Sequence, residues 1–250
     1  MHIVVCVKHV VDSTEIHVDK KTNELVLRGL STKINDYDKN AVEKAVKLKK
    51  ELGGTVSLLC IGPREAQKTL KEALAMGADQ AYLLQVSPRQ QLDTAQVALI
   101  LSKMAASIEP ADLVFCGEVS EDGYNSQTGA RLAERLHLPQ VSYVTKLDAQ
   151  EGGYVAESTL ESTVETVKGA TPALLTISSA INVPHLPTAI QIMKVRGNRI
   201  KSLKLSDIGL DDSVLEQPAV KMLGYEIPEQ ERKNIMIDGS AAEAAASLVK

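Results

Sequence analysis

The stretch LVFCGEVSEDGYNSQTGARLAERLHLP, residues 113–139, decides the interpretation of the whole chain. Its first four residues, 113–116, form an apolar run that is typical of a buried strand. A polar loop, residues 118–127, follows, and then a helical apolar pattern that includes Leu132 and Leu136. Ligands of parallel α/β sheets bind beyond the carboxyl ends of the strands, and a helix start offers unpaired N–H groups to a phosphate. This order therefore predicts a nucleotide-binding turn; an ordinary capped loop is the alternative.

The composition indicates a core built from Val, Ile, Leu and Ala. Of the 250 residues 44% are apolar, but only one is Phe and none is Trp. The net charge of −4, with both signs interspersed, argues against nucleic-acid binding, which calls for a basic patch. No apolar run reaches the ~18 residues of a membrane span, and no leader pattern opens the chain. We therefore expect a cytoplasmic protein without a membrane span.

Sequence signals for catalysis and for metal binding are absent. The chain has no Walker motif, no glycine-rich dinucleotide fingerprint and no catalytic triad recognisable from spacing. The five His and three Cys lack metal-ligand spacing, and the Cys lie in apolar runs that are typical of a core. We therefore expect no catalytic residue and no metal site, and a carrier or binding role rather than turnover of a substrate.

Strand and helix patterns alternate along the first half of the chain. Amphipathic helices separate four runs typical of buried strands, at residues 2–7, 55–61, 80–86 and 113–116. Asp38 is the expected N-cap of the first helix. The alternation predicts a doubly wound, mostly parallel, Rossmann-like sheet. After Pro139 the helices stop, and an antiparallel extension is expected from strands at residues 140–147, 154–167 and 173–177.

Two regions are expected along the chain. Residues 1–205 form the α/β nucleotide-binding domain, with a β-hairpin within residues 10–29 outside the main sheet. Over residues 206–250 no period holds for long although apolar residues recur, so we interpret this part as an extended arm that packs on a partner subunit. Ser240 and Glu243 form a capping-box pattern for a short final helix.

The segment NVPHLPTAIQIMK, residues 182–194, is a second candidate for contact with a partner. Its two prolines favour a stiff, projecting loop, and its apolar tip fits no core period. The alternative is a loop folded back on its own sheet.

Several segments resemble the beta subunit of electron transfer flavoprotein, and they occur in the order of that family. The likeness runs from residue 1 to about 195 and, more weakly, to the end. Segment 182–194 resembles the loop by which the family recognises dehydrogenases. The other matching segments are VKHV at residues 7–10 followed by Asp12, AVEKAVKLK at 41–49, ALAMGAD at 73–79 and QTG at 127–129.

The resemblance implies a heterodimer with a homologous alpha subunit that holds most of an FAD. It implies that this chain holds AMP as a structural element, or a second FAD in electron-bifurcating members, in which NADH is the donor. A flavin dehydrogenase such as an acyl-CoA dehydrogenase is the implied docking partner. The implied recognition residues are Pro184, His185, Leu186, Pro187, Ala189, Ile190, Ile192 and Met193. The implied nucleotide-binding residues are Cys6, Asn35, Asp36, Tyr37, Asp38, Ile61, Gly117, Glu118, Val119, Ser120, Asp122, Gly123, Asn125, Ser126, Gln127 and Thr128.

The sequence departs from the family pattern at several positions. Residues 35–36 are Asn-Asp where many members have Asn-Pro, residues 184–185 are Pro-His where many have Pro-Arg, and residues 156–158 lack a common Arg. Residues 122–123 are similar to the bifurcating type and residues 127–129 to the AMP-holding type, so both occupants stay open. The leading hypothesis is an electron carrier. The alternatives are an NADH-oxidising subunit of a bifurcating complex and a stand-alone adenine-nucleotide sensor.

Overall fold

The computed structural model describes residues 1–19, 21–22, 24–26, 29–88, 90–225, 227 and 234–249. The chain divides into two compact units, Met1–Ile16 with Leu27–Met222 and His17–Val26 with Leu223–Lys250. The first unit contains a nine-stranded sheet in the order β11-β10-β9-β12-β8-β1-β6-β7-β13. Its strands are β1 (His2–Cys6), β6 (Thr55–Gly62), β7 (Gln80–Gln85), β8 (Leu113–Gly117), β9 (Gln140–Gln150), β10 (Gly153–Thr159), β11 (Val164–Ala170), β12 (Ala173–Ile177) and β13 (Ile200–Leu203).

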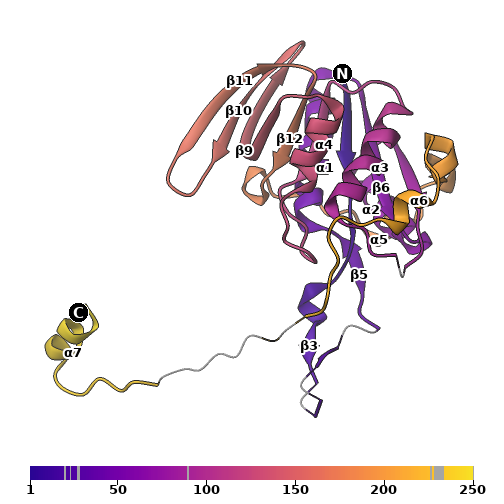
Figure 1. Ribbon diagram of the computed structural model, residues 1–250. Helices are drawn as coiled ribbons and strands as arrows, with labels where there is room; N and C mark the ends of the chain where they lie inside the picture. Colours follow the sequence, from indigo (N-terminus) through magenta and orange to yellow (C-terminus); the bar gives the residue numbers. More distant parts are fainter. Residues whose placement is uncertain are drawn as a thin grey trace. The chain divides into compact units, whose positions relative to one another are not determined.

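The sheet is parallel from β9 to β13, and the β9–β10 and β10–β11 pairs are antiparallel. The antiparallel strands extend to one side of the sheet (Figure 1). The expected fold class, a mostly parallel doubly wound sheet with an antiparallel extension, is therefore confirmed.

Four main helices cover the two faces of the parallel part. They are α1 (Asp36–Leu52), α2 (Gln67–Met76), α3 (Thr94–Ala106) and α4 (Thr128–Leu136). Successive side chains of a strand point to opposite faces, so β1 sends Ile3 and Val5 to the core beneath α1 and α2. It sends Val4 and Cys6 to the core beneath α3 and α4. Both cores are mostly aliphatic, as the scarcity of aromatic residues predicts, and Phe115, Tyr154 and Tyr82 are buried in them as well.

The strand order reverses at β1. The chain leaves β1 for β6 and β7 on one side and then crosses to β8 on the other, so the switch point lies between β1 and β8. The last residues paired between these strands are Val5 and Phe115. Farther along, Val7 N–H donates to the Leu59 carbonyl on β6 (2.8 Å), and Glu118 N–H donates to Ile177 on β12 (3.0 Å). The two strands thus part at their carboxyl ends. Ligands of such folds bind beyond this point, in the crevice outside the strand ends.

Several boundaries differ from those expected. Residues 154–167 form two strands, β10 and β11, rather than one. Asp38 lies in the first turn of α1, and Asn35 is the N-cap. Strand β13 at the edge beside β7 was not expected. The remaining elements of the first unit are β2 (His9–Val11) paired with β5 (Thr32–Ile34), α5 (Ala189–Met193), and the short helices η1 (Ser13–Glu15), η2 (Arg64–Ala66), η3 (Ser179–Ile181) and η4 (Gly197–Arg199).

The first unit continues beyond residue 205, where the arm was expected to begin. Elements η5 (Leu205–Ile208) and α6 (Ser213–Glu216) follow β13, and Leu205 and Ile208 are buried in the core beneath α3 and α4. The Gln96 side chain of α3 donates to the Val214 carbonyl (2.7 Å). Residues 206–222 are therefore tied to the sheet by both apolar and polar contacts.

The second unit contains the hairpin expected within residues 10–29 and the expected final helix. Strands β3 (His17–Val18) and β4 (Leu25–Val26) pair antiparallel. Helix α7 (Ala241–Leu248) begins with the predicted capping box, in which Ser240 accepts from Glu243 N–H and the Glu243 carboxylate accepts from Ser240 N–H. Residues 20, 23, 27–28, 226, 228–233 and 250 of these expected segments lie outside the described residues.

Candidate nucleotide-binding site

The first turn of α1 joins the ends of β1 and β8. Asp38 is only 5% exposed, and its carboxylate accepts Lys8 N–H at 2.7 Å and Gly117 N–H at 3.1 Å. Asn35 N–H donates to the Lys8 carbonyl at 3.1 Å. Lys8 follows β1, and Gly117 is the last residue of β8. Because these two strands part at the switch point, α1 holds both sides of the crevice.

The Asn35 side chain fixes the first half of the loop between β8 and α4. Its amide N–H donates to the Val119 carbonyl (2.9 Å), and its amide oxygen accepts Glu121 N–H (3.1 Å). Asn35 is 1% exposed, so both polar atoms of a buried amide are satisfied by the loop. This contact explains why the side chain does not cap α1, although Asn35 is the N-cap residue.

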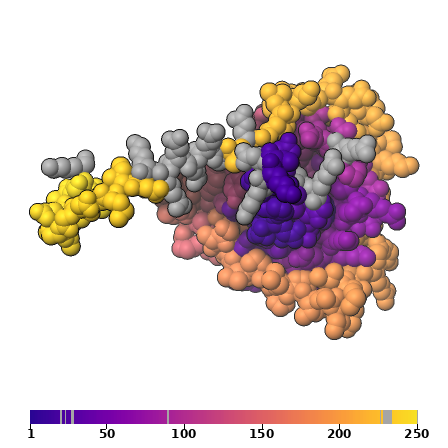
Figure 2. Space-filling view, turned by 90° about the horizontal axis from the view of Figure 1, so that it is seen from below, coloured from indigo at the N-terminus to yellow at the C-terminus, as the bar shows by residue number. Residues whose placement is uncertain are grey.

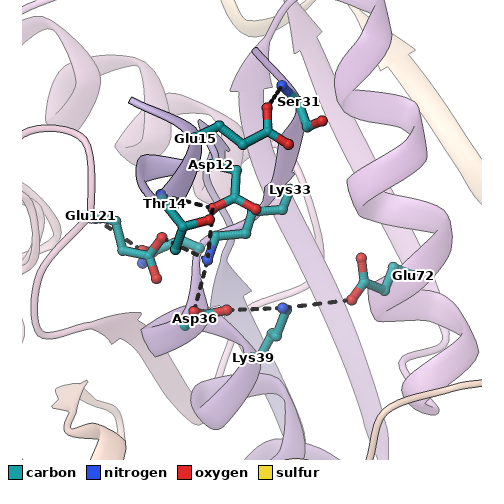
Figure 3. A network of polar contacts seen from close by, with 10 residues as sticks. Asp12, Thr14, Glu15, Ser31, Lys33, Asp36, Lys39, Glu72 and Glu121 are labelled. Atoms are coloured by element: carbon teal, nitrogen blue, oxygen red, sulfur yellow. Dashed lines mark hydrogen bonds and ion pairs between the residues drawn. The ribbon is translucent and has the colours of Figure 1, made fainter. Parts of the chain in front are cut away.

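A network of charges reaches the same loop at Glu121 (Figure 3). The Lys33 ammonium lies 3.0 Å from Glu121 and 2.9 Å from Asp36, and Lys39 lies 2.9 Å from Asp36 and 3.9 Å from Glu72. Burial opposes the charge on Asp36, but the hydrogen bonds of Glu121, Lys39 and Lys33 outweigh it and hold the pKa of Asp36 well below its usual value. Burial, and then the adjacent Asp36, raise the pKa of Glu121. The network ties the loop to β5 and α1.

The second half of the loop is exposed and carries backbone strain. Tyr124 and Ser126 have φ values of 47° and 50°, a region that side chains other than glycine rarely adopt and that clusters at ligand sites. Lys8 reaches over the loop to Asp122 at 2.6 Å and to the Ser120 hydroxyl at 3.2 Å. Both ionic side chains are partly exposed, so this pair adds little to stability by itself.

The start of α4 is open. No side chain of the described residues caps its first turn, and the preceding Gln127 side chain instead accepts a hydrogen bond from the Thr94 hydroxyl at 2.9 Å. Gly129 is buried against β12, where an added Cβ would lie 2.5 Å from Thr176 Cγ2. The missing side chain thus lets the helix start close to the strand ends, and a helix start offers unpaired N–H groups to an anion.

The Gly129→Ala variant is expected to displace the start of α4. Thr176 cannot easily yield, because its hydroxyl accepts Tyr143 N–H at 2.9 Å. Overpacking of this kind costs about 1–3 kcal/mol, so urea denaturation should show that loss together with weaker nucleotide binding. Gly197→Ala, at a glycine where an added Cβ would meet nothing within 4 Å, is the matched control and should change neither. Unaltered stability of Gly129→Ala would show that α4 has room to move.

The remaining predicted site residues occupy more varied positions. The Cys6 thiol lies in the core beneath α3 and α4, and its hydrogen bond with Cys116, followed by burial, raises its pKa well above the ordinary value. Only the backbone of Cys6 is therefore available to a ligand. Burial raises the pKa of Tyr37, which lies beside Tyr124, and the pKa of Glu118. Ile61 lies on β6 and packs against the same core as Cys6.

Sequence reasoning missed two residues that shape this site, Lys8 and Lys33, although Glu121 lay within the predicted loop. Each contacts a predicted site residue or the loop itself. A signal was available for Lys8 alone, because it is the first charged residue after an apolar strand that ends at the expected binding edge.

The apolar tip of segment 182–194 is exposed. Leu186, Ile190 and Met193 retain 62%, 60% and 76% of their surface, while Asn40 of α1 anchors the base of the segment through the Asn182 carbonyl at 2.8 Å. In the space-filling view, orange atoms along the lower border belong to this part of the chain (Figure 2). The tip is therefore held out from the sheet by polar contacts at its base.

Comparisons with known proteins identify relatives of this chain. The family model described as electron transfer flavoprotein domain matches residues 22–208. The electron transfer flavoprotein subunit beta of Thermoanaerobacterium thermosaccharolyticum is 36% identical over 100% of this chain and 97% of its own, and that of Bacillus subtilis is 33% identical over 100% and 96%. The caffeyl-CoA reductase-Etf complex subunit CarD of Acetobacterium woodii is 32% identical over 100% and 97%.

Within the described ranges, no helix is long and apolar enough to cross a membrane. The family match covers most of the chain, and relatives above 30% identity cover all of it. The chain therefore belongs to the electron transfer flavoprotein family, a family of flavoproteins, as a homologue of its beta subunits with a role in electron transfer.

Proposed function

We propose that this chain pairs with an alpha subunit that holds most of an FAD, and that its own crevice holds an adenine nucleotide, AMP or FAD. The observation that carries the proposal is the open start of α4, which follows a strained, glycine-containing loop at the switch point. FAD, when bound at the subunit interface, supplies the electron-carrying chemistry of the complex. This chain contributes binding and orientation, and we assign it no substrate turnover of its own.

The available hydrogen-bond donors orient the proposed nucleotide. The strand-end N–H groups of Lys8 and Gly117 are already taken by Asp38, so a phosphate at that point would meet a carboxylate. The first-turn N–H groups of α4 have no side-chain cap, and the helix dipole adds positive potential there. The phosphate is therefore directed to Thr128 and its neighbours, with the exposed loop residues beside the sugar.

The identity of the nucleotide separates two functions. AMP would make the complex a simple electron shuttle between a flavin dehydrogenase and an acceptor. FAD would favour a bifurcating complex that oxidises NADH at this chain, and the similarity to a subunit of a CoA reductase complex is the observation that supports this second candidate.

The deciding experiment is the cofactor content of the chain purified with its alpha subunit. The complex is denatured, and the released FAD and AMP are quantified per heterodimer. One FAD with one AMP supports the shuttle, and two FAD without AMP support the bifurcating complex, which is then tested for reduction by NADH. If the chain purifies alone, without a flavin-bearing partner, the result would contradict the proposal and favour the alternative of a stand-alone nucleotide sensor.

The exposed tip of segment 182–194 is the proposed docking point for a redox partner. Ile190→Asp places a charge on an apolar contact that is 60% exposed in the free chain. We expect kcat/KM for reduction by an acyl-CoA dehydrogenase to fall at least about tenfold, which corresponds to about 1.4 kcal/mol. Nucleotide content should not change. Leu160→Asp, an exposed apolar position between β10 and β11, is the control, and an equal loss there would argue against specific docking.

A further inference from the structure

The Asp38 side chain bridges the backbone gap between the ends of β1 and β8. Beyond Val5 and Phe115 the strands pair with their outer neighbours instead of with each other. The N–H groups of Lys8 and Gly117 then have no strand partner across the gap, and each donates to a different oxygen of Asp38. At the switch point a buried carboxylate therefore accepts the N–H groups that backbone carbonyls of a neighbouring strand accept in the rest of the sheet.

The fit around this carboxylate is close. A Cβ on Gly117 would lie 2.4 Å from Asp38 Oδ1 and 2.9 Å from Tyr37 Cβ, so the strand end requires glycine for the carboxylate to reach it. Lys8 is held at both of its backbone polar groups, because its carbonyl accepts a hydrogen bond from Asn35 N–H while its own N–H donates to Asp38. Lys8 and Gly117 are thus fixed by α1, and the loop that follows Gly117 starts from a fixed point.

We propose that Asp38 is a positioning residue of the nucleotide site: its carboxylate sets the separation of the β1 and β8 ends, and so the direction of the loop toward α4, without touching the nucleotide. The inference rests on the proposed nucleotide site. It differs from the sequence-based expectation, which counted Asp38 among the binding residues, because both carboxylate oxygens are engaged by the protein and the residue is 5% exposed.

The charge on Asp38 is expected to matter near neutral pH. Burial raises the pKa of Asp38 to about 7, against the hydrogen bonds from Lys8, Asn35 and Gly117 and the positive charge of Lys8. The other titratable groups that face it are the thiols of Cys6 on β1 and Cys60 on β6, whose raised pKa values keep them neutral. Protonation leaves one carboxyl oxygen a poor acceptor, so one strand end is released as the pH falls below about 7.

The test measures AMP binding by titration calorimetry to the heterodimer stripped of nucleotide, at pH 6, 7 and 8, with FAD titrated in parallel. In the wild type, binding should weaken below pH 7. Asp38→Asn should weaken binding at least about tenfold at pH 8, and its affinity should lose the part of the pH dependence that Asp38 contributes. Glu51→Gln, which removes an exposed carboxylate from the same helix, should follow the wild type.

A second variant guards against misfolding of Asp38→Asn. Gly117→Ala leaves the carboxylate in place but displaces it, and it should weaken binding in the same direction. Wild-type affinity and an unchanged pH profile in Asp38→Asn would overturn the inference while leaving the nucleotide site intact. Failure of the wild type itself to bind AMP or FAD would defeat the proposed function, and the inference with it.

Discussion

The Thr128→Asp variant is expected to purify without nucleotide and to be slightly more stable than the wild type. Thr128 is the first residue of α4, where no side chain occupies the N–H groups. A carboxylate there interacts favourably with the helix dipole, worth about 0.3–1 kcal/mol, but it repels a phosphate that approaches the same groups. Two like charges about 4 Å apart cost several kcal/mol near a protein surface, so nucleotide affinity should fall at least about 100-fold.

The measurement pairs cofactor content with thermal unfolding of the nucleotide-free proteins. The control is Thr128→Asn, because Asn has nearly the same shape as Asp but no charge. Its nucleotide affinity should stay within a few-fold of the wild type. This pair separates charge from shape. Retention of AMP or FAD by Thr128→Asp would remove the start of α4 from the site and return the loop to an ordinary connection.

The second large effect concerns stability and pH at Asp38. The pKa of this carboxyl is raised from 3.8 to about 7 by burial, so between these values the folded chain holds a proton that the unfolded chain releases. The wild type therefore loses stability as the pH rises through this window, and the contribution is fully present only below the unfolded value. Asn does not titrate, so the stability of Asp38→Asn relative to the wild type should increase by as much as about 1.4 kcal/mol per pH unit there.

Urea denaturation of both proteins at pH 5, 6, 7 and 8, at one concentration of heterodimer, measures this difference. From pH 5 to 7 it should move by about 2 kcal/mol in favour of the variant. Taking the difference between variant and wild type cancels the pH-dependent contributions of the other carboxyl groups, which both proteins share. Asp36 is one of them, and its pKa is shifted in the opposite direction. Parallel curves would mean that Asp38 is already ionised throughout, with a folded pKa near the ordinary value.

Local sequence patterns predicted the parts of the fold that depend on local signals. The buried runs and helical stripes give the order of β1, α1, β6, α2, β7, α3, β8 and α4, and strand-loop-helix order singled out the loop after β8. The break between β10 and β11 was missed because the connecting residues 160–163 include no Gly, Pro, Asn or Asp to mark a turn. A hydrogen bond from Leu160 N–H to the Thr163 carbonyl (2.8 Å) closes that turn.

Long-range contacts account for the rest of the differences. Asn and Asp have similar N-cap preference, so the choice of Asn35 over Asp38 depends on partners elsewhere: Asp38 bonds Gly117, 79 residues away. Strand β13 is four residues long and owes its existence to pairing with β7. The contact of Lys33 with Glu121 likewise joins segments that no sequence period connects. The sequence singled out the loop after β8 and named Asn35 and Asp38, but it could not show which groups these two side chains contact.

The attachment of residues 206–222 to α3 has a practical consequence for dissecting this chain. Asp93 at the start of α3 accepts the N–H groups of Ala219 and Val220, and Gln90 donates to the Leu215 carbonyl at 2.8 Å. A fragment that ends at residue 205 would lack Ile208 and the N–H groups of Ala219 and Val220. It would therefore expose part of the apolar core beneath α3 and α4 to solvent. The smallest autonomous fragment for isotope labelling or for display should therefore end near Met222, where the compact unit ends.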